Sequence, residues 1–416
     1  MDTNSRIANR NYKHKSSFYS CLFTFSFLLF TFYFSNAQSD VLKYARTVVD
    51  TLAAPSMHGR GYVNKGDSIA ADYIKKEFQR FGVKPLSREL YQRFNFPVNT
   101  FPGEMEITAN KKKLIPGKDF IMDENSGGGK GNYKVKVIKN SPRSYKRGAQ
   151  VFLDSMQMVL NPEYSLVSSG SKLTYDIGQI NSPLVIFQIK DSLLKHFPKK
   201  VRINIDNKLI QQYQSQNVIG YIQGTEYRDS IIVFTAHYDH LGQMGKDVYF
   251  PGANDNASGC AMLLNLAKYF SEHKPKYSVA FMAFGGEEAG LLGSKYYVEH
   301  PLFPLNQIKF LVNMDLLGTG DEGIKVVNAT EHKKEFDELV KINSEKNLLP
   351  SVQPRGKAAI SDHYFFEEAG VKTFYIYTLG GIKAYHDIYD RPETLPLTKF
   401  EEVFKLLTNF TDYLQQ

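Results

Sequence analysis

The sequence contains only two cysteines, Cys21 and Cys260, among 416 residues. Cys21 lies in an N-terminal apolar segment that we expect to be removed, so one cysteine remains and no intrachain disulfide can form, even in an oxidising compartment. This excludes a disulfide framework as the source of stability. Apolar types make up 42% of the residues, which is ample for a large buried core.

The sequence also lacks a concentrated charge of one sign. Its formal net charge is +8, and removal of the N-terminal segment, which holds four basic residues and Asp2, lowers it to +5. The lysines are scattered, as at 111–113 and 199–200, and form no basic stripe interleaved with aromatics. We therefore expect no nucleic-acid binding. The 26 Tyr and 30 Phe argue against disorder over most of the length.

The N-terminal segment has the three parts of a secretory signal peptide. A basic opening precedes an apolar run at 18–34, and the small residues at 35–37 suit a cleavage site near Gln38. The run is slightly short for a bilayer span, which disfavours the alternative of an uncleaved signal anchor. We expect residues 1–37 to be a signal peptide, and the mature protein to be periplasmic or secreted without stable membrane insertion.

The periodicity of apolar residues along the chain changes twice after this segment. Residues 41–52 and 68–81 have helical periodicity, whereas 91–213 consist of short alternating runs broken by turns. From 217 onward, strands alternate with helices. Strands are expected at 217–222, 230–236, 277–284, 308–314 and 373–378, and helices at 257–270, 291–298, 331–346 and 397–414.

This order predicts an α/β fold, a three-layer sandwich with a central, mostly parallel mixed sheet between helices. We expect residues 38–90 and 214–416 to form this main domain and 91–213 to form a β-rich insertion.

Polar residues recur where the predicted strands end. The strand at 230–236 runs into His237, the strand at 277–284 precedes Glu287 and Glu288, and the strand at 308–314 runs into Asp315. Further polar motifs surround Asp255, before a helix, and His386, after the last strand. Functional groups of such sheets gather beyond the carboxyl ends of the strands. Five nitrogen and oxygen donors suit zinc, and one shared carboxylate would give each of two ions three protein ligands.

Taken together, the motifs resemble those of the M28 family of zinc aminopeptidases. They are His237-x-Asp239, the Asn-Asp-Asn-Ala-Ser-Gly run at 254–259, Glu287-Glu288-x-Gly-Leu-Leu-Gly-Ser, Asn313-Met-Asp315 and Tyr385-His386. The resemblance covers 216–416 closely and 41–88 loosely. Five ordered motifs are far more specific than any one of them.

The resemblance implies a role for each matching residue. His237 and Asp315 would hold one zinc ion, Glu288 and His386 a second, and Asp255 would bridge them. Glu287 would be the general base, Asp239 would orient His237, and Tyr385 would donate to the tetrahedral oxyanion. The implied substrates are peptides with a free N-terminus, whose ammonium group would lie near Glu287 and Asp315. The insertion occupies the place where many relatives carry a protease-associated domain, and we expect it to roof the site.

Several alternatives stay open at this point. Glutaminyl cyclisation on the same fold uses one zinc, so the full ligand set, with His237 and Asp255, disfavours it. Carboxypeptidase or dipeptidase activity is compatible with the same metal site. A catalytically silent peptide-binding ectodomain would be expected to have lost ligands. Oligomeric state and the preferred N-terminal residue are not predicted.

Several further polar residues and one cysteine lie outside these motifs. Ser361 and Asp362 precede an apolar helix at His363 and suit either an N-cap or a pocket role. His240 suits either a place behind the metal ligands or the surface. Cys260 is expected in the core, because it shares a helix face with apolar residues. Arg355 would be within reach of a substrate carbonyl, although a solvated loop position is the simpler interpretation.

Overall fold

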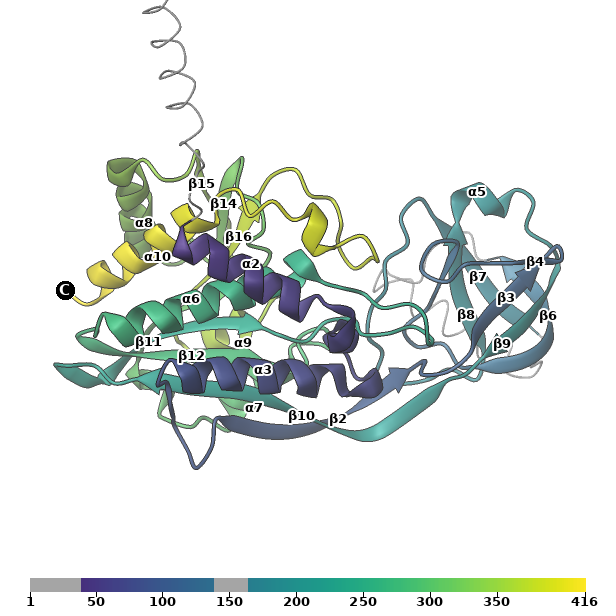
Figure 1. Cartoon of the computed structure of the whole chain (residues 1–416), viewed down its shortest axis with the longest axis horizontal. Coiled ribbons are helices and arrows are strands. Elements are labelled where there is room, and N and C mark those ends of the chain that lie inside the picture. The colour runs from purple at the N-terminus through teal and green to yellow at the C-terminus, as the bar shows by residue number, and fades with distance from the viewer. Residues whose placement is uncertain (1–38, 138–163) are drawn as a thin grey trace, which may run out of the picture.

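The computed structural model of the chain describes residues 39–137 and 164–416. The predicted signal peptide lies outside the described residues and stays a prediction. Two β-sheets, one of nine strands and one of seven, lie toward opposite ends of an elongated molecule (Figure 1). Within the described ranges, none of the helices combines the length and the hydrophobicity that crossing a membrane requires.

The nine-stranded sheet has the order β1-β10-β12-β11-β13-β16-β14-β15, with β2 also paired to β10. Its strands are β1 (Lys84–Pro85), β2 (Tyr91–Thr100), β10 (Lys208–Ile222), β11 (Tyr227–His237), β12 (Tyr277–Phe284), β13 (Ile308–Met314), β14 (Gly323–Val327), β15 (Val352–Pro354) and β16 (Thr373–Leu379). The four central strands β12, β11, β13 and β16 are mutually parallel, and β10 and β14 run antiparallel beside them. The predicted mixed α/β sheet is confirmed.

Helices cover both faces of this sheet. On one face lie α2 (Asp40–Leu52), α3 (Gly66–Arg80), α6 (Gly259–Glu272), α8 (Lys333–Lys346) and α10 (Phe400–Leu414), and on the other lie α7 (Leu292–Glu299) and α9 (His363–Glu368). Short helical turns connect them: η1 (Pro55–Arg60), η2 (Val63–Lys65), η4 (Leu305–Gln307) and η5 (Pro392–Thr394). The result is the predicted three-layer sandwich.

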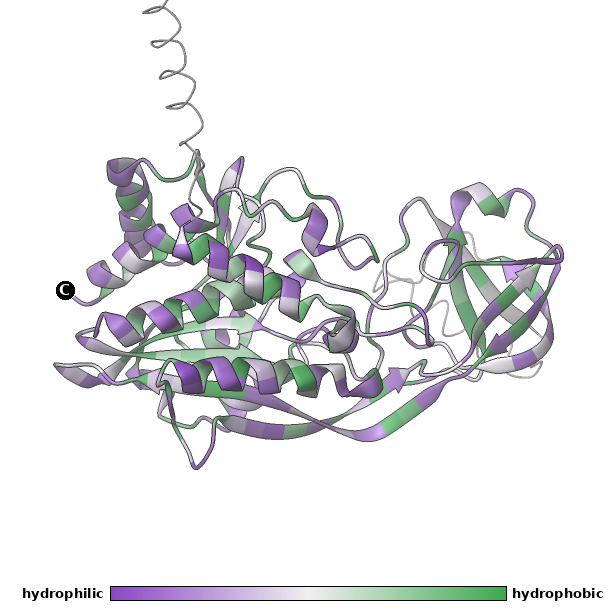
Figure 2. Cartoon of the chain, viewed as in Figure 1, coloured by the Kyte–Doolittle hydropathy of each residue, from purple (hydrophilic) through white to green (hydrophobic). Residues whose placement is uncertain are grey.

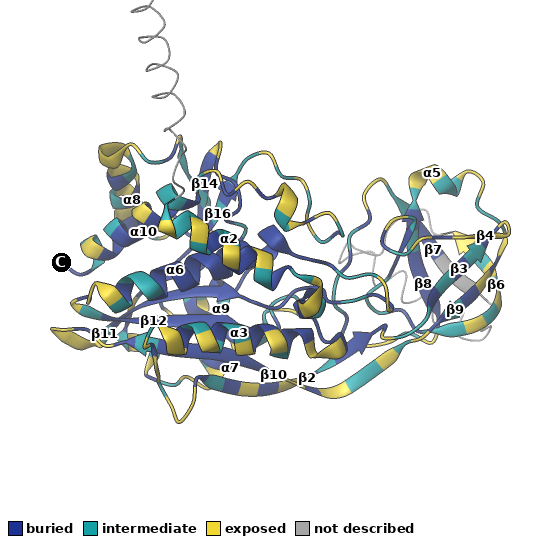
Figure 3. Ribbon diagram, in the orientation of Figure 1, coloured by how far each residue is buried: buried dark blue, intermediate teal, exposed yellow. Residues whose placement is uncertain are grey.

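Alternation along β11 explains the layers. Ile232 and Phe234 belong to the core beneath α6, whereas Val233 belongs to the core that contains Tyr297 of α7 and Phe366 of α9. Successive side chains of a strand point to opposite faces, so a strand buried on both sides needs a continuous apolar run. Figure 2 shows the central strands as largely hydrophobic, and Figure 3 shows them buried while the helices expose their outer faces.

The first helix shows how local sequence sets these elements. Ser39 precedes α2 as its N-cap, and its Oγ accepts a hydrogen bond from the Leu42 amide at 3.2 Å. The buried residues Ala45, Val48, Val49 and Leu52 follow helical spacing, so one stripe of α2 packs on the core.

The seven-stranded sheet occupies residues 105–205 in the order β4-β3-β9-β6-β7-β8-β5. Its elements are β3 (Met105–Ala109), β4 (Lys112–Lys113), β5 (Phe120–Met122), β6 (Gly129–Val137), β7 (Tyr164–Gly170), β8 (Val185–Lys190), the short α5 (Asp191–Leu194) and β9 (Lys200–Ile205). It encloses a core of its own. The paired strands β2 and β10, at the two ends of the predicted insertion, form a ribbon that connects the two sheets (Figure 1).

Candidate metal centre

Three neighbouring parallel strands end at one edge of the nine-stranded sheet, and each delivers polar side chains there. His237 is the last residue of β11, Asp315 directly follows β13, and Glu287 and Glu288 lie in the turn after β12. The parallel pairing of β11 with both β12 and β13 keeps the strand ends level. The pattern of strands alone therefore brings these four residues to one edge.

Two further predicted residues reach this edge from loops. Asp255 lies in an irregular turn, Ala253–Ser258, just before α6. Its amide donates to the carboxylate of Asp390 at 2.9 Å, and its carbonyl accepts from Arg60 at 3.0 Å, so its backbone is held on two sides. His386 lies in the loop between β16 and η5, in the left-handed region at φ 52°.

Asp255 stands between two histidines. Its Oδ1 lies 3.3 Å from Nε2 of His237, and its Oδ2 lies 3.2 Å from Nε2 of His386. Each histidine nitrogen also faces a second carboxylate: Asp315 Oδ1 is 3.4 Å from His237, and Glu288 Oε2 is 3.1 Å from His386. The five side chains thus form two groups that share one carboxylate, which is the partition implied by the family resemblance.

Two overlapping groups of donor atoms are compact enough to hold an ion. One contains His237, Glu287 and Asp315, and the other contains His237, Asp255 and Glu288, with the donor atoms of each group within 4.8 Å of one another. These groups differ from the expected partition, because they include Glu287 and omit His386. The pairwise distances are the better guide, since Nε2 of His386 lies within 3.2 Å of both Asp255 and Glu288.

The donor set fits zinc. Imidazole nitrogen and carboxylate oxygen are its common ligands. Oδ1 of Asp315 is buried and forms no hydrogen bond of ordinary geometry among the described residues, with Nε2 of His237 3.4 Å away; a buried carboxylate oxygen of this kind is suited to a cation. Four carboxylates, those of Asp255, Glu287, Glu288 and Asp315, line one cavity, and this buried negative charge requires cations nearby. The residues present therefore suit zinc.

Burial and neighbouring charges shift the pKa values of the two adjacent glutamates in opposite directions. Burial raises the pKa of Glu287 well above its ordinary value; His237 opposes the rise, and the carboxylates around it, Asp362 foremost, add to it. Burial also favours a raised pKa for Glu288, but the positive charge of His386 and the hydrogen bond from His240 outweigh it and hold the pKa of Glu288 at about 2. One glutamate is thus suited to carry a proton and the other to remain an anion.

Asp239 contacts His237 through its backbone carbonyl rather than through its carboxylate. Its carboxylate lies 3.8 Å from Nδ1 of His237, beyond hydrogen-bond distance, and Nδ1 lies 3.2 Å from the Asp239 carbonyl instead. The carboxylate is occupied by other donors: the Tyr62 hydroxyl at 2.9 Å and the amides of Glu287 and Glu288 at 3.1 and 3.3 Å. Asp239 therefore fixes the turn that carries the two glutamates.

Tyr385 lies at the mouth of the cavity. Its ring stacks on His386 with centroids 4.0 Å apart, and the residue is 46% exposed. The cavity has a volume of about 360 Å³, which is at the small end for ligand sites. It is lined by His237, Asp255, Glu287, Glu288, Asp315, Leu316, Arg355, Ile360, Tyr375, Tyr377, Tyr385 and His386.

Two residues behind the predicted ligands complete their surroundings. His240 is fully buried, and its Nδ1 lies 2.6 Å from Oε1 of Glu288. Of its two possible positions, it therefore occupies the one behind the metal ligands and not the one at the surface. Asp176, from the segment between β7 and β8, lies 2.8 Å from Nδ1 of His386. Sequence analysis missed Asp176, because it is separated from His386 by 210 residues.

The structure also shows the positions of the other residues whose roles the sequence left open. Ser361 is buried and donates to Oδ2 of Asp315 at 3.2 Å, and Asp362 at the start of α9 makes no capping hydrogen bond. Cys260 lies in the core, as expected. Arg355 is half-buried and lines the cavity.

Arg60 is a further residue that sequence analysis missed. It is completely buried, and its guanidinium donates to five carbonyl oxygens, those of Leu52, Tyr238, Pro251, Gly252 and Asp255, at 2.7 to 3.0 Å. These carbonyls belong to segments beside both His237 and Asp255. Arg60 thus ties the two loops of the centre together.

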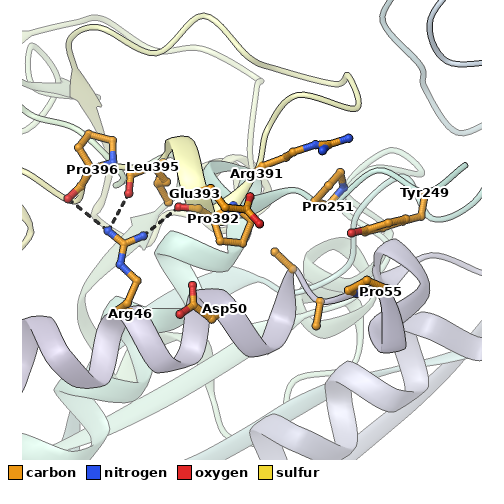
Figure 4. Close-up of a pocket in the computed structure, with 12 residues that line it drawn as sticks. Arg46, Asp50, Pro55, Tyr249, Pro251, Arg391, Pro392, Glu393, Leu395 and Pro396 are labelled. Carbon is orange, nitrogen blue, oxygen red and sulfur yellow. Dashed lines mark hydrogen bonds between the residues drawn. The ribbon is translucent and has the colours of Figure 1, made fainter.

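A larger cavity, of about 700 Å³, lies between α2 and residues 391–396 and contains none of the centre's residues. On its wall, Arg46 of α2 donates to the carbonyls of Pro392, Leu395 and Pro396 (Figure 4). These bonds fasten the loop that follows His386 to the first helix.

Comparison with known sequences matches residues 217–411 to peptidase family M28. Aminopeptidase YwaD of Bacillus subtilis is 29% identical over 262 residues, which cover 61% of this chain and 54% of YwaD. A probable zinc metalloprotease of Pyrenophora teres f. teres is 35% identical over 113 residues, which cover 26% of this chain and 23% of that protein. The chain thus spans about half of the first relative's length and about a quarter of the second's.

Solved structures of two bacterial enzymes share the fold. A zinc aminopeptidase of Bacillus subtilis, BSAP, superposes with a TM-score of 0.67 at 19% identity, covering 89% of this chain and 94% of BSAP. An aminopeptidase from Aneurinibacillus sp. strain AM-1 superposes with a TM-score of 0.65 at 18% identity, covering 91% and 94%. Residues 217–411 are thus similar in sequence to peptidase family M28, and the chain shares the fold of the two aminopeptidase structures.

Proposed function

We propose that this chain is an exported two-zinc aminopeptidase, which hydrolyses the first peptide bond of peptides with a free N-terminus. The observation that carries the proposal is the position of Asp255, whose two oxygens face His237 and His386 at 3.3 and 3.2 Å. Relatives named aminopeptidase and zinc metalloprotease support the zinc-dependent aminopeptidase part of the proposal.

Zinc would be held by His237 and Asp315 on one side, and by Glu288 and His386 on the other, with Asp255 between them. When bound, zinc polarises the substrate carbonyl and lowers the pKa of water, so that a nucleophile is available near neutral pH. The other steps belong to side chains of the chain itself.

Glu287 is the proposed general base. It would accept a proton from the attacking water and deliver it to the amine that leaves. A carboxylate that lines the cavity beside the metal ligands without being one of them is placed for this shuttle. The Asp239 carboxylate accepts a hydrogen bond from the Glu287 amide at 3.1 Å, and this bond holds the turn after β12 in place.

Substrate orientation would come from the edge of the cavity. The α-ammonium group would lie against the carboxyl groups of Glu287 and Asp315, which would accept its hydrogen bonds, and the Tyr385 hydroxyl would donate a hydrogen bond to the oxyanion. The small cavity, of about 360 Å³, admits one end of a peptide rather than a long segment of it.

A substrate panel tests this proposal. Aminoacyl p-nitroanilides and dipeptides should be cleaved, and the same compounds with an acetylated amino group should not. Cleavage of acetylated compounds at equal rates would refute aminopeptidase activity, and cyclisation of N-terminal glutamine without hydrolysis would point to a glutaminyl cyclase. Export is tested separately by N-terminal sequencing of the mature protein, which should begin near Gln38.

A further inference from the structure

Arg355 is held rigidly at the rim of the catalytic cavity. It directly follows β15, and its amide donates to the Val326 carbonyl of β14 at 2.8 Å, while its own carbonyl accepts from the Ala329 amide at 3.1 Å. Its Nη1 donates to the hydroxyl of Tyr377 on β16 at 3.0 Å. Its backbone is thus tied to β14 and to the turn after β14, and its side chain to β16.

The surface between Arg355 and the acidic centre is continuous. Tyr375 and Tyr377 are two positions apart on β16, so they share a face of the sheet, with rings 5.4 Å apart, and both line the cavity with Arg355. Their spacing along the strand is about 7 Å. Lys325 pairs with Tyr377 in the adjacent strand and adds a second cation to this face.

The Arg355 guanidinium keeps donors for a ligand. In residues 39–137 and 164–416, no carboxylate forms an ion pair with it, and its side-chain bond goes to the neutral Tyr377 hydroxyl. The carboxylate of Glu331, near this loop, is engaged by the Thr330 hydroxyl at 2.9 Å and the Lys357 amide at 3.3 Å. A guanidinium has five N–H donors, and two on one edge match a carboxylate.

We propose that Arg355, supported by Tyr377, is a subsite for a substrate carboxylate. The inference rests on the proposed function: the substrate's ammonium group lies at Glu287 and Asp315 while its carboxylate binds Arg355. Substrates are then peptides that carry both charges a short distance apart. The carboxylate is either the C-terminus of a very short peptide or the side chain of an acidic N-terminal residue.

Two matched pairs of substrates distinguish these sources. Ala-Ala and Ala-Ala-amide differ only in the C-terminal carboxylate, and Glu- and Gln-p-nitroanilide differ only in the side-chain carboxylate. The zinc-loaded protein should have a kcat/KM at least roughly ten-fold higher for the charged member of one pair, because charge-assisted bidentate bonds are strong. R355Q should abolish that preference, mainly by raising KM for the charged member about ten-fold more than for the amide member, while R355K should retain part of the preference.

Each outcome bears on one of the two proposals. If none of the four compounds is cleaved, the proposed function is contradicted. If the two members of each pair are cleaved at equal rates, the subsite is contradicted. An equal loss of both pair members in R355Q also contradicts the subsite, since it indicates a structural role. Calorimetric titration of the four compounds into E287Q, with and without R355Q, tests the subsite even without turnover: the ten-fold preference should appear in E287Q and vanish in the double variant.

Discussion

Replacement of Asp176 by Asn should weaken one of the two proposed zinc sites. The Asp176 carboxylate lies 2.8 Å from Nδ1 of His386, whose other ring nitrogen faces Asp255 and Glu288. A carboxylate in this position fixes the ring and increases its basicity as a ligand. Its removal should therefore act on the site that contains His386 and spare the site that contains His237.

The magnitude follows from the exposure of Asp176. Loss of such a partner typically lowers metal affinity 10- to 100-fold, which corresponds to about 1.4 to 2.7 kcal/mol. The Asp176 side chain is 38% exposed, so solvent screens its charge and the lower end of this range applies. We expect a roughly ten-fold weaker binding of one ion.

Zinc titration against a chromophoric chelator measures the two affinities separately. Asp191→Asn is a matched control, because Asp191 is an exposed carboxylate at the start of α5, outside the centre. The control should bind both ions as the wild type does. Unchanged binding in Asp176→Asn, or equal weakening of both ions, would refute the reasoning.

Further substitutions test individual residues. Glu287→Gln should lower kcat by about 10²- to 10⁴-fold with zinc content unchanged, and a loss of zinc would identify Glu287 as a ligand instead. Arg60→Met should reduce the free energy of unfolding by about 3 kcal/mol or more in chemical denaturation, because five buried carbonyls lose their donor; a change below 1 kcal/mol would contradict this. Burial lowers the pKa of His363 to about 4, so the unfolded state, with a pKa near 6.5, binds the proton more tightly. The wild type should therefore lose about 3 kcal/mol of stability as the pH falls from 6.5 to 4, and His363→Gln should lack this part of the slope; identical slopes would refute it.

Much of the fold could be predicted because its signals are local. The apolar runs that end at His237, Phe284 and Met314 indicate buried parallel strands, and the polar residues beyond them must then share an edge. Boundaries differ where the backbone is irregular: the helix expected from Ala257 begins at Gly259, because an irregular turn carries Asp255 into the centre first.

The parts that sequence analysis missed depend on contacts between distant segments. Nothing near Asp176 indicates a partner 210 residues away, and its segment belongs to the β-rich part of the chain, whose own pattern shows only strands. The resemblance implies that Asp239 orients His237, yet Tyr62 and the two glutamate amides lie closer to the Asp239 carboxylate. Local spacing cannot rank such competing donors.

The zinc content of the purified mature protein, measured by elemental analysis beside an Asp255→Ala variant, tests the shared centre most directly. We expect two zinc ions per wild-type chain and a loss of both tight sites in the variant, because its carboxylate faces both histidines. A wild-type chain that is active with one ion or none, or a variant that keeps two ions at full affinity, would contradict the account.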